Sequence, residues 1–558
     1  MDEMKTILEV ARKNRPADLV IKNAQVYNPF IQEWEKIDFA IQNGRIAGTG
    51  SYQGVHELDF RGLSVVPGFI DAHVHIESSL LIPTEFSRLV LSHGTTTIIA
   101  DPHEIANVCG MAGIEYMLAS RDNTPLDLLF TIPSCVPATP LDEAAEVLDA
   151  TSLSRFIDRQ GILGMGEMMN IPGVLNQDPD VMQKLTLMQI RDGHAPFLTG
   201  PDLQAYLAAG IQSDHETISP EEGWEKIKSG MYLYLREGST EHNLTALLPV
   251  VNAATVDRCS FCTDDRHADM LIEAGHIDDC IRKAIANGLE PELAYRMATL
   301  SPAERFSLHD RGALAPGRLA DFCVIDNVST CNVIKTFKKG KEITNLVYLP
   351  PRHGEYQFRS RIPSISEIQI TGEGMARVIG IMEGQIATES LTFDVFGNAI
   401  PDLDQDILKV VVASRYDDSN VGIGLVHGLR MTKGAIGCSV AHDSHHVIAV
   451  GTTDEEIIHA CREIIKNRGG MVCIREGRTT LLPLTCAGLM AEEPFERVYD
   501  QMSLMKQEIM KTGSIADPFM YLSFLSLTVI PSLRVTPKGV FDSSAFAHVS
   551  LFTDEEHE

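Results

Sequence analysis

The sequence of 558 residues predicts an α/β protein built around a TIM-type (β/α)8 barrel. Eight short apolar runs alternate with helical stretches between Val66 and Leu308, which is the pattern of repeated βα units. Alternating β-like segments precede and follow this block. In a last stretch of about 200 residues, alternating β-like segments surround helical stretches without the regular βα repeat. The chain is also too long for one hydrophobic core. We therefore expect a barrel accompanied by two further domains.

The segments that flank the barrel are expected to form one small domain. They alternate apolar and polar residues and end in turn residues, at positions 18–29, 36–50, 314–326 and 332–343. Because strands of the same kind lie on both sides, we predict a composite β-sandwich of residues 1–65 and 310–350 around a barrel of residues 66–309. Residues 351–558 are expected to form an additional C-terminal α/β (α+β) domain.

The eight predicted barrel strands are the runs GFIDAHVHI, TTTIIADPHE, LLFTIPSCV, GILGMGEMM, GHAPFL, GIQSDHE, YLYLREGS and RCSFCTDD. The carboxyl ends of barrel strands meet at one face, where active sites form. Ionisable side chains stand at or near these ends, namely His73, His75, Glu167, His194, His215 and Asp264. The sequence therefore predicts a polar site at the mouth of the barrel.

Composition limits the partners of the chain. Lys and Arg number 47 against 76 Asp and Glu, and a formal charge of −29 opposes binding to a polynucleotide. Eleven cysteines lack framework spacing, which is typical of reduced thiols in a cytosolic protein. The charged N-terminus predicts an amphipathic helix rather than a secretory signal, and the longest apolar run, residues 519–533, is too short for a bilayer. We expect a cytoplasmic protein with no membrane partner.

Histidines and carboxylates at the strand ends indicate a metal site. His73 and His75 are one residue apart, so in a strand both imidazoles project from the same face. His194, His215 and Asp264 each follow a later strand. Each of these residues alone has an ordinary interpretation as a packed polar side chain. Five candidate ligands on four strands of one barrel favour a mononuclear or binuclear centre.

Glu167 adds a sixth candidate ligand. It lies in LGMGEMM, where glycines and methionines offer a buried carboxylate no partner. A bridging carboxylate can hold two divalent ions about 3.5–4 Å apart. The alternative is a buried structural glutamate paired with a neighbouring histidine.

Longer motifs resemble a known family. PGFIDAHVHIE, GTTTIIADPHEIANV, GHAP, SDHE and TDDRH resemble the adenine deaminases of the amidohydrolase superfamily, over essentially the whole chain. The first motif is shared with dihydroorotases, hydantoinases and sugar deacetylases. The motifs VHIESS, ADPHEIANV, YLYLREGS, AHDSHHVIAVGT and LSFLSLTVIPSLRVT discriminate within the superfamily. The resemblance implies hydrolysis of adenine to hypoxanthine and ammonia, as in purine salvage.

The resemblance also implies roles for the metal ligands. His73 and His75 would bind one divalent ion, His194 and His215 a second, and Glu167 would bridge them. Asp264 would ligate metal and take a proton from the metal-activated water that attacks C6 of adenine. Histidine and carboxylate ligands suit Mn²⁺, Fe²⁺ and Zn²⁺ alike, and the family likeness favours Mn or Fe.

Further residues are candidates for acid catalysis and substrate binding. Glu77 follows His75 by two residues on the same side of an extended chain, so it could protonate the purine ring, although a surface or capping glutamate is an equal alternative. Arg236 and Ser239 in LREGS are candidates for contacting the purine edge. Phe197, Thr199 and Ala268 depart from the family pattern, which leaves the loops beside the site and the fine substrate preference open.

Two other histidine motifs have competing interpretations. His103 and Glu104 in DPHEIAN could orient a ligand, or begin a helix capped by Asp101, which we favour. AHDSHH contains His442, His445 and His446 and could suggest another metal site. Because only one carboxylate, that of Asp443, lies nearby in the sequence, we interpret AHDSHH as a turn.

A different deaminase class binds zinc through H-x-E and P-C-x-x-C motifs. This chain has His75 and Glu77, then Cys259 and Cys262 preceded by Arg258 rather than proline. In a strand the two thiols would face opposite sides, so we interpret them as core residues.

Two alternative functions stay open. The same site could hydrolyse a cyclic amide or related ring, or the barrel could be a non-catalytic interaction protein, which would not need every ligand position. The C-terminal domain could cover the barrel mouth, pair two subunits, or both. We expect a homodimer.

Overall fold

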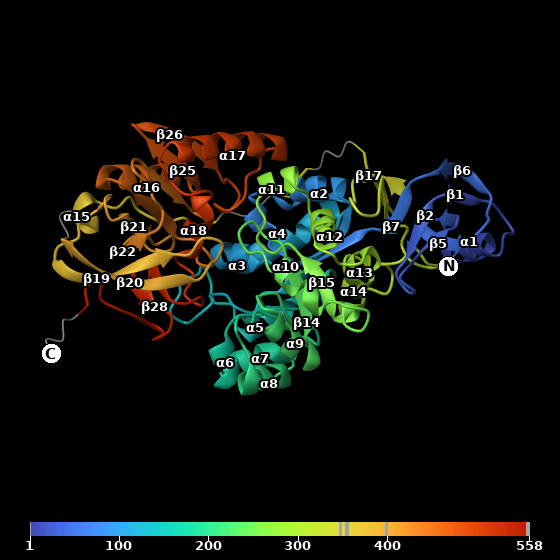
Figure 1. Ribbon diagram of the computed structural model, residues 1–558, viewed down its shortest axis with the longest axis horizontal. Helices are drawn as coiled ribbons and strands as arrows, with labels where there is room; N and C mark the ends of the chain where they lie inside the picture. The colour runs from blue at the N-terminus through green and yellow to red at the C-terminus, as the bar shows by residue number, and fades with distance from the viewer. Residues whose placement is uncertain (1, 345–348, 352–355, 397–399, 554–558) are drawn as a thin grey trace.

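A computed structural model describes residues 2–344, 349–351, 356–396 and 400–553. Its three parts follow one another along the long axis (Figure 1). The N-terminal strands lie at one end, the βα units lie in the middle, and the C-terminal segment lies at the other end. Among the described residues, no helix combines the length and apolar character needed to cross a membrane. All eleven cysteines are free thiols.

The middle part is an eight-stranded parallel barrel, which confirms the predicted fold class. Its strands are β8 (Phe69–Val74), β9 (Thr95–Ala100), β10 (Asp127–Ile132), β11 (Ile162–Met168), β12 (Arg191–Gly193), β13 (Ser213–Asp214), β14 (Tyr232–Arg236) and β15 (Cys259–Cys262). Strands β8 to β12 pair in chain order, and so do β13 to β15. Backbone hydrogen bonds link these sheets at both seams: Gln212 N–H donates to Arg191 O, and Asp264 N–H donates to His73 O, where Val74 also pairs in parallel with Asp264.

The eight strands follow the predicted runs with one shift. The fifth strand is Arg191–Gly193, so it lies almost entirely before the predicted run GHAPFL and overlaps it only at Gly193. Pro196 cannot donate a backbone hydrogen bond, so pairing ends before it. His194 consequently stands directly after the strand, at the barrel mouth.

Helices surround the barrel between successive strands. They are α2 (Pro83–Ser92), α3 (His103–Cys109), α4 (Met111–Ser120), α5 (Ala150–Leu153), α6 (Ile171–Leu175), α7 (Pro179–Leu187), α8 (Gly200–Ala208), α9 (Pro220–Lys228), α10 (Leu244–Leu247), α11 (Ala268–Glu273), α12 (Ile277–Ala286), α13 (Pro291–Met297) and α14 (Leu300–Arg305). Local sequence sets the start of α9: proline occupies its first turn and Ser219 Oγ accepts a hydrogen bond from Glu222 N–H.

Strands from both sides of the barrel share one sheet. The N-terminal helix is α1 (Asp2–Ala11), and a four-stranded sheet has the order β5 (Arg45–Thr49), β4 (Phe39–Gln42), β1 (Ala17–Lys22) and β6 (Gly54–Asp59). A six-stranded sheet has the order β18 (Lys341–Glu342), β17 (Val333–Lys338), β16 (Phe322–Ile325), β7 (Ser64–Pro67), β2 (Gln25–Asn28) and β3 (Glu33–Lys36). Because β16 pairs with β7, the barrel is an insertion between two strands of this sheet.

The C-terminal segment has its own eight-stranded sheet. The order is β20 (Thr388–Phe396), β19 (Glu373–Ile381), β22 (Val421–His427), β21 (Ile407–Ala413), β24 (Val447–Gly451), β23 (Ala435–Cys438), β25 (Gly470–Arg475) and β26 (Arg478–Pro483). Its helices are α15 (Ile365–Ile368), α16 (Asp454–Asn467), α17 (Phe495–Met510) and α18 (Pro518–Phe524). A small sheet of β27 (Leu533–Thr536), β28 (Gly539–Asp542) and β29 (Ala547–His548) completes the segment.

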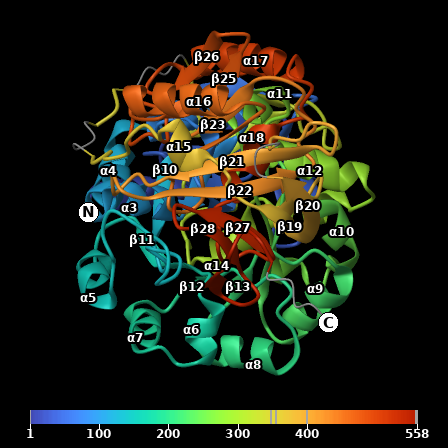
Figure 2. The same ribbon diagram turned by 90° about the vertical axis from the view of Figure 1, so that its left-hand side faces the viewer.

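The C-terminal segment packs directly on the barrel. One hydrophobic core contains barrel residues such as Ile105 and Phe86 together with Leu408, Val450 and Met490 of the C-terminal segment. Seen from the C-terminal side, the orange and red strands lie in front of the barrel (Figure 2). This shared core places C-terminal side chains at the mouth, where the strands of the barrel end.

Candidate metal centre at the barrel mouth

The six predicted metal ligands converge at the mouth of the barrel. They come from β8, β11 and the residues just after β8, β12, β13 and β15, and they are His73, His75, Glu167, His194, His215 and Asp264. None of these side chains belongs to a residue that is more than 7% exposed. Asp264 has a φ of 53°, a left-handed conformation that aspartate tolerates better than most residues.

One half of the cluster gathers around His75. Its Nε2 lies 3.2 Å from Glu167 Oε1, 3.1 Å from Asp264 Oδ1 and 3.1 Å from His73 Nε2. Ligands about 2.1 Å from one tetrahedral ion are about 3.4 Å apart, so these separations suit a shared ion. His75 Nδ1 contacts the Asp101 carbonyl oxygen at 3.0 Å, which orients the ring.

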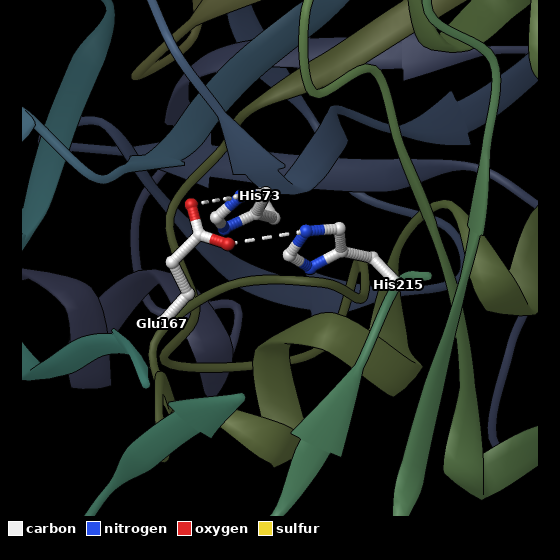
Figure 3. Close-up of side chains that lie close together, drawn as sticks. All are labelled: His73, Glu167 and His215. Carbon is white, nitrogen blue, oxygen red and sulfur yellow. Dashed lines mark ion pairs between the residues drawn. The ribbon is translucent and has the colours of Figure 1, made fainter. Parts of the chain in front are cut away.

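The other half gathers around the second oxygen of Glu167. Glu167 Oε2 lies 2.9 Å from His194 Nδ1 and 3.3 Å from His215 Nε2. The two carboxylate oxygens therefore face different imidazoles, and Figure 3 shows Glu167 reaching His73 with one oxygen and His215 with the other. This is the arrangement that a bridging carboxylate requires.

Glu216 also belongs to the site, and the sequence reasoning missed it. Its Oε1 lies 3.7 Å from His194 Nδ1 and 3.6 Å from His215 Nε2. Its carboxylate accepts hydrogen bonds from Arg236. The only sequence signal was its position directly after His215 in SDHE.

Electrostatics keep the central carboxylates ionised. Burial alone would raise the pKa of Glu167, but His194 and His215 hold that pKa well below its usual value. Burial would likewise raise the pKa of Asp264, which Arg236 and His215 lower well below the usual range. Buried carboxylates that stay charged among imidazoles fit a divalent transition ion.

Arg236 and Ser239 have different surroundings. An inner cavity at the barrel mouth is lined by five of the predicted ligands, His75, Glu167, His194, His215 and Asp264, together with other residues. The Arg236 guanidinium also lines this inner cavity but is paired with Glu216 and, at 2.6 Å, with Asp264 Oδ2. Ser239 Oγ accepts a hydrogen bond from His267 N–H at 2.9 Å and is not among the residues lining this cavity. Arg236 therefore contacts Asp264, the predicted general base, whereas Ser239 is bound to the backbone of the loop at His267.

The prediction that Asp101 caps helix α3 is wrong. Helix α3 begins at His103 with Pro102 in the cap position, and no side chain caps it. Asp101 Oδ2 instead accepts a hydrogen bond from Glu167 N–H at 3.0 Å. The reason is that Glu167 brings an unpaired backbone donor to this carboxylate, which therefore positions the bridging residue.

His103 and Glu104 both face the site. His103 Nδ1 lies 3.7 Å from Glu167 Oε1. Glu104 is hydrogen-bonded to His442 and His445, so AHDSHH meets a barrel carboxylate that the sequence reasoning did not connect with it. His446 lies outside this cluster and accepts a hydrogen bond from Arg415 N–H at 3.2 Å.

Two glutamates have a pKa near neutrality. Glu77 begins the short 3-10 helix Glu77–Ser79, where Oε1 accepts a hydrogen bond from Ile105 N–H at 3.1 Å and Oε2 has no hydrogen-bond partner among the described residues. Burial raises the pKa of Glu77 to about 7, but the residue does not line the inner cavity. Glu241, which the sequence reasoning missed, does line it, and burial raises the pKa of its carboxyl to about 7 as well.

Residues of the C-terminal segment roof the inner cavity. Ile386, Asp443, Phe524 and Leu527 line it opposite the barrel ligands, so this segment covers the mouth. An outer cavity of about 240 Å³ shares Glu216, Arg236, Glu241 and Ile386 with the inner one. The shared walls make the outer cavity the approach to the metal ligands.

Exposed apolar residues stand at the outer cavity. Phe197 is 60% exposed with a φ of 58°, and Ile218 is 49% exposed. A left-handed phenylalanine is uncommon, so this loop conformation is held by its surroundings. Both side chains are available to a planar ring that enters here.

Comparison with known proteins identifies the family. The amidohydrolase family profile matches residues 64–343, and the profile of the adenine deaminase C-terminal domain matches residues 385–547. The adenine deaminase of Methanoregula boonei is 55% identical over 550 residues, which covers 98% of each chain. That of Methanoculleus marisnigri is 55% identical over 518 residues, covering 93% of this chain and all of the relative.

The crystal structure of an adenine deaminase is 18% identical, with a TM-score of 0.44, and covers 59% of this chain and 100% of its own. The assignment to a family is based on the two sequence relatives and the two family profiles. The chain belongs to the adenine deaminases of the amidohydrolase family.

Proposed function

We propose that the barrel mouth is where this enzyme hydrolyses adenine to hypoxanthine and ammonia. Relatives that are 55% identical over nearly the whole chain support the reaction. The observation that carries the site assignment is Glu167, which offers one oxygen to His75 and the other to His194. A buried bridge of this kind is suited to a metal-dependent hydrolase.

We propose two divalent ions, with Mn²⁺ or Fe²⁺ ahead of Zn²⁺. His73, His75 and Asp264 would hold one ion, His194 and His215 the other, and Glu167 both. When bound, such an ion supplies Lewis acidity and lowers the pKa of coordinated water toward 7. The chain itself supplies the orientation of these ligands and the exclusion of bulk water by the C-terminal roof.

Proton transfers belong to residues of the chain. Asp264 is placed to accept the proton of the attacking water, since Arg236 keeps its carboxylate ionised. As the C6–O bond forms, a ring nitrogen must gain a proton. Asp264 then returns the proton of the attacking water to the amino group, so that the C6–N bond breaks with release of neutral ammonia. Glu77 was the sequence candidate for this acid, while the cavity lining favours Glu241.

The domain division and the assembly are further proposals. Residues 1–65 with 310–350 form the β-sandwich domain, residues 66–309 the barrel, and residues 351–558 the C-terminal domain. The pairing of β7 with β16 supports the first of these units. We also propose a homodimer, which light scattering of the purified protein will test.

The test of function is ammonia release from adenine. Chelator-treated protein is reloaded with Mn²⁺ or Fe²⁺ under reducing conditions and compared with Glu167→Gln and Asp264→Asn. We expect turnover by the wild type and none by either variant. Metal-replete wild type that releases no ammonia would contradict the adenine assignment, and a panel of cyclic amides would then be tested.

A further inference from the structure

A second cluster of metal-ligand side chains lies beside the centre, between the barrel and the C-terminal segment. The loop after β23 brings His442, Asp443 and His445 over the start of α3, where His103 and Glu104 lie. All five residues are at most 6% exposed. The cluster thus joins two parts of the chain that are far apart in sequence.

The distances within this cluster resemble a coordination sphere. His103 Nε2 lies 3.5 Å from Glu104 Oε1 and 3.7 Å from Asp443 Oδ1. Both separations are too long for hydrogen bonds, yet they are close to the spacing of about 3.4 Å between ligands of one tetrahedral ion. His442 Nδ1 is hydrogen-bonded to the same Glu104 oxygen, so its imidazole lies directly beside these three side chains.

The carboxylates of the cluster are paired with imidazoles rather than with lysine or arginine. Within the described part of the chain, neither Glu104 nor Asp443 forms an ion pair with lysine or arginine. Asp443 Oδ2 is buried and has no hydrogen-bond partner there. Two buried carboxylates with imidazoles around them match the charge and ligand type of one divalent cation.

We propose that His103, Glu104 and Asp443, with His442 beside them, bind a further divalent transition ion. The site is distinct from the ligands around Glu167 because His103 divides its ring: Nδ1 lies 3.7 Å from Glu167 and Nε2 faces Glu104 and Asp443. An ion here ties the C-terminal roof to the barrel. Its ligands come from both parts of the chain, so neither part alone contains the site.

Crystals of the full wild-type chain grown with Mn²⁺ test the proposal directly. We expect an anomalous difference peak about 2–2.3 Å from His103 Nε2, Glu104 Oε1 and Asp443 Oδ1, in addition to density at the Glu167 centre. Crystals that show Mn²⁺ at Glu167 and no peak between Glu104 and Asp443 would overturn the proposal. This readout does not depend on adenine turnover.

Metal analysis of variants provides a second measurement. Asp443→Asn keeps the shape but removes a charge, and after equilibrium dialysis against Mn²⁺ it is expected to hold one equivalent fewer per chain than the wild type. His446→Asn is the matched control, because His446 lies in the same loop but outside the cluster; its Mn²⁺ content should equal the wild type. Equal content in a folded Asp443→Asn protein would contradict the site. If that variant does not fold, the wild-type crystals decide.

Discussion

Arg236 donates a hydrogen bond from Nη1 to Oδ2 of Asp264 over 2.6 Å. The other oxygen of Asp264 lies 3.1 Å from His75 Nε2. The two oxygens of this carboxylate therefore have separate partners: Oδ2 faces the permanently charged Arg236, and Oδ1 faces the predicted metal ligand His75. Because the arginine is always protonated, it keeps Asp264 available as a base.

Replacing Arg236 by glutamine should raise the pKa of Asp264. The base form is lost as pH falls through that pKa, so the acidic limb of the kcat/KM profile should move to higher pH by about one unit or more. We expect kcat/KM at neutral pH to fall by about 100-fold. Arg236→Lys keeps the charge and should shift the limb less. A limb that stays in place in Arg236→Gln would contradict this role.

The ring-protonating acid can be identified with paired variants. Glu241→Gln should lower kcat by about 100-fold, whereas Glu77→Gln should cost less than about tenfold, since only Glu241 lines the inner cavity. Metal content measured in parallel should match the wild type in both. A larger loss in Glu77→Gln would return the role to Glu77.

The same acid should appear in the pH profile. Burial raises the pKa of Glu241 to about 7, so its acid form is present below that value and is lost as pH rises through it. The kcat/KM for adenine should therefore decline above about pH 7. A profile that stays flat to pH 9 would argue against a carboxylic acid in this step.

Lys226 should be important for stability and for the position of the ligand loops. It is fully buried, and its Nζ donates to Ala195 O at 2.7 Å and to Asp214 Oδ2 at 3.0 Å. Lys226→Met leaves Asp214 buried without its cation, so the free energy of unfolding should fall by about 3–5 kcal/mol. Denaturant unfolding measures this. The exposed Lys228 on the same helix provides the control, and Lys228→Met should change stability by less than about 0.5 kcal/mol.

Metal removal should destabilise the folded protein. An ion that binds only the native state at 1,000 times its Kd adds about 4 kcal/mol to the free energy of unfolding. Calorimetry of chelator-treated protein should therefore show a lower Tm that Mn²⁺ restores. In Glu167→Gln the restoration should be much smaller. Superimposable traces with and without Mn²⁺ in the wild type would contradict a metal centre.

Local sequence patterns were sufficient to predict the barrel. Strand alternation and turn residues predicted its eight strands, with only β12 shifted toward the N-terminus. Because parallel strands end at one face, the same rule predicts from the sequence that His73, Glu167 and Asp264 lie together. This reasoning missed Glu216, which ends the predicted run GIQSDHE directly after His215, and Glu241, which lies two residues beyond the predicted run YLYLREGS.

By itself, the sequence determined the fold class, the family and which side chains meet at the barrel mouth, because these follow from short periodic patterns and from motifs. Only the tertiary structure decided what covers that mouth. Glu104 and His442 are 338 residues apart, and their contact depends on the apolar core that joins the barrel to the C-terminal sheet. Packing between such distant surfaces has no periodic signature in the sequence. AHDSHH therefore predicted only a turn, which residues 442–445 do form, whereas the contact of that turn with the Glu104 carboxylate depends on the tertiary structure.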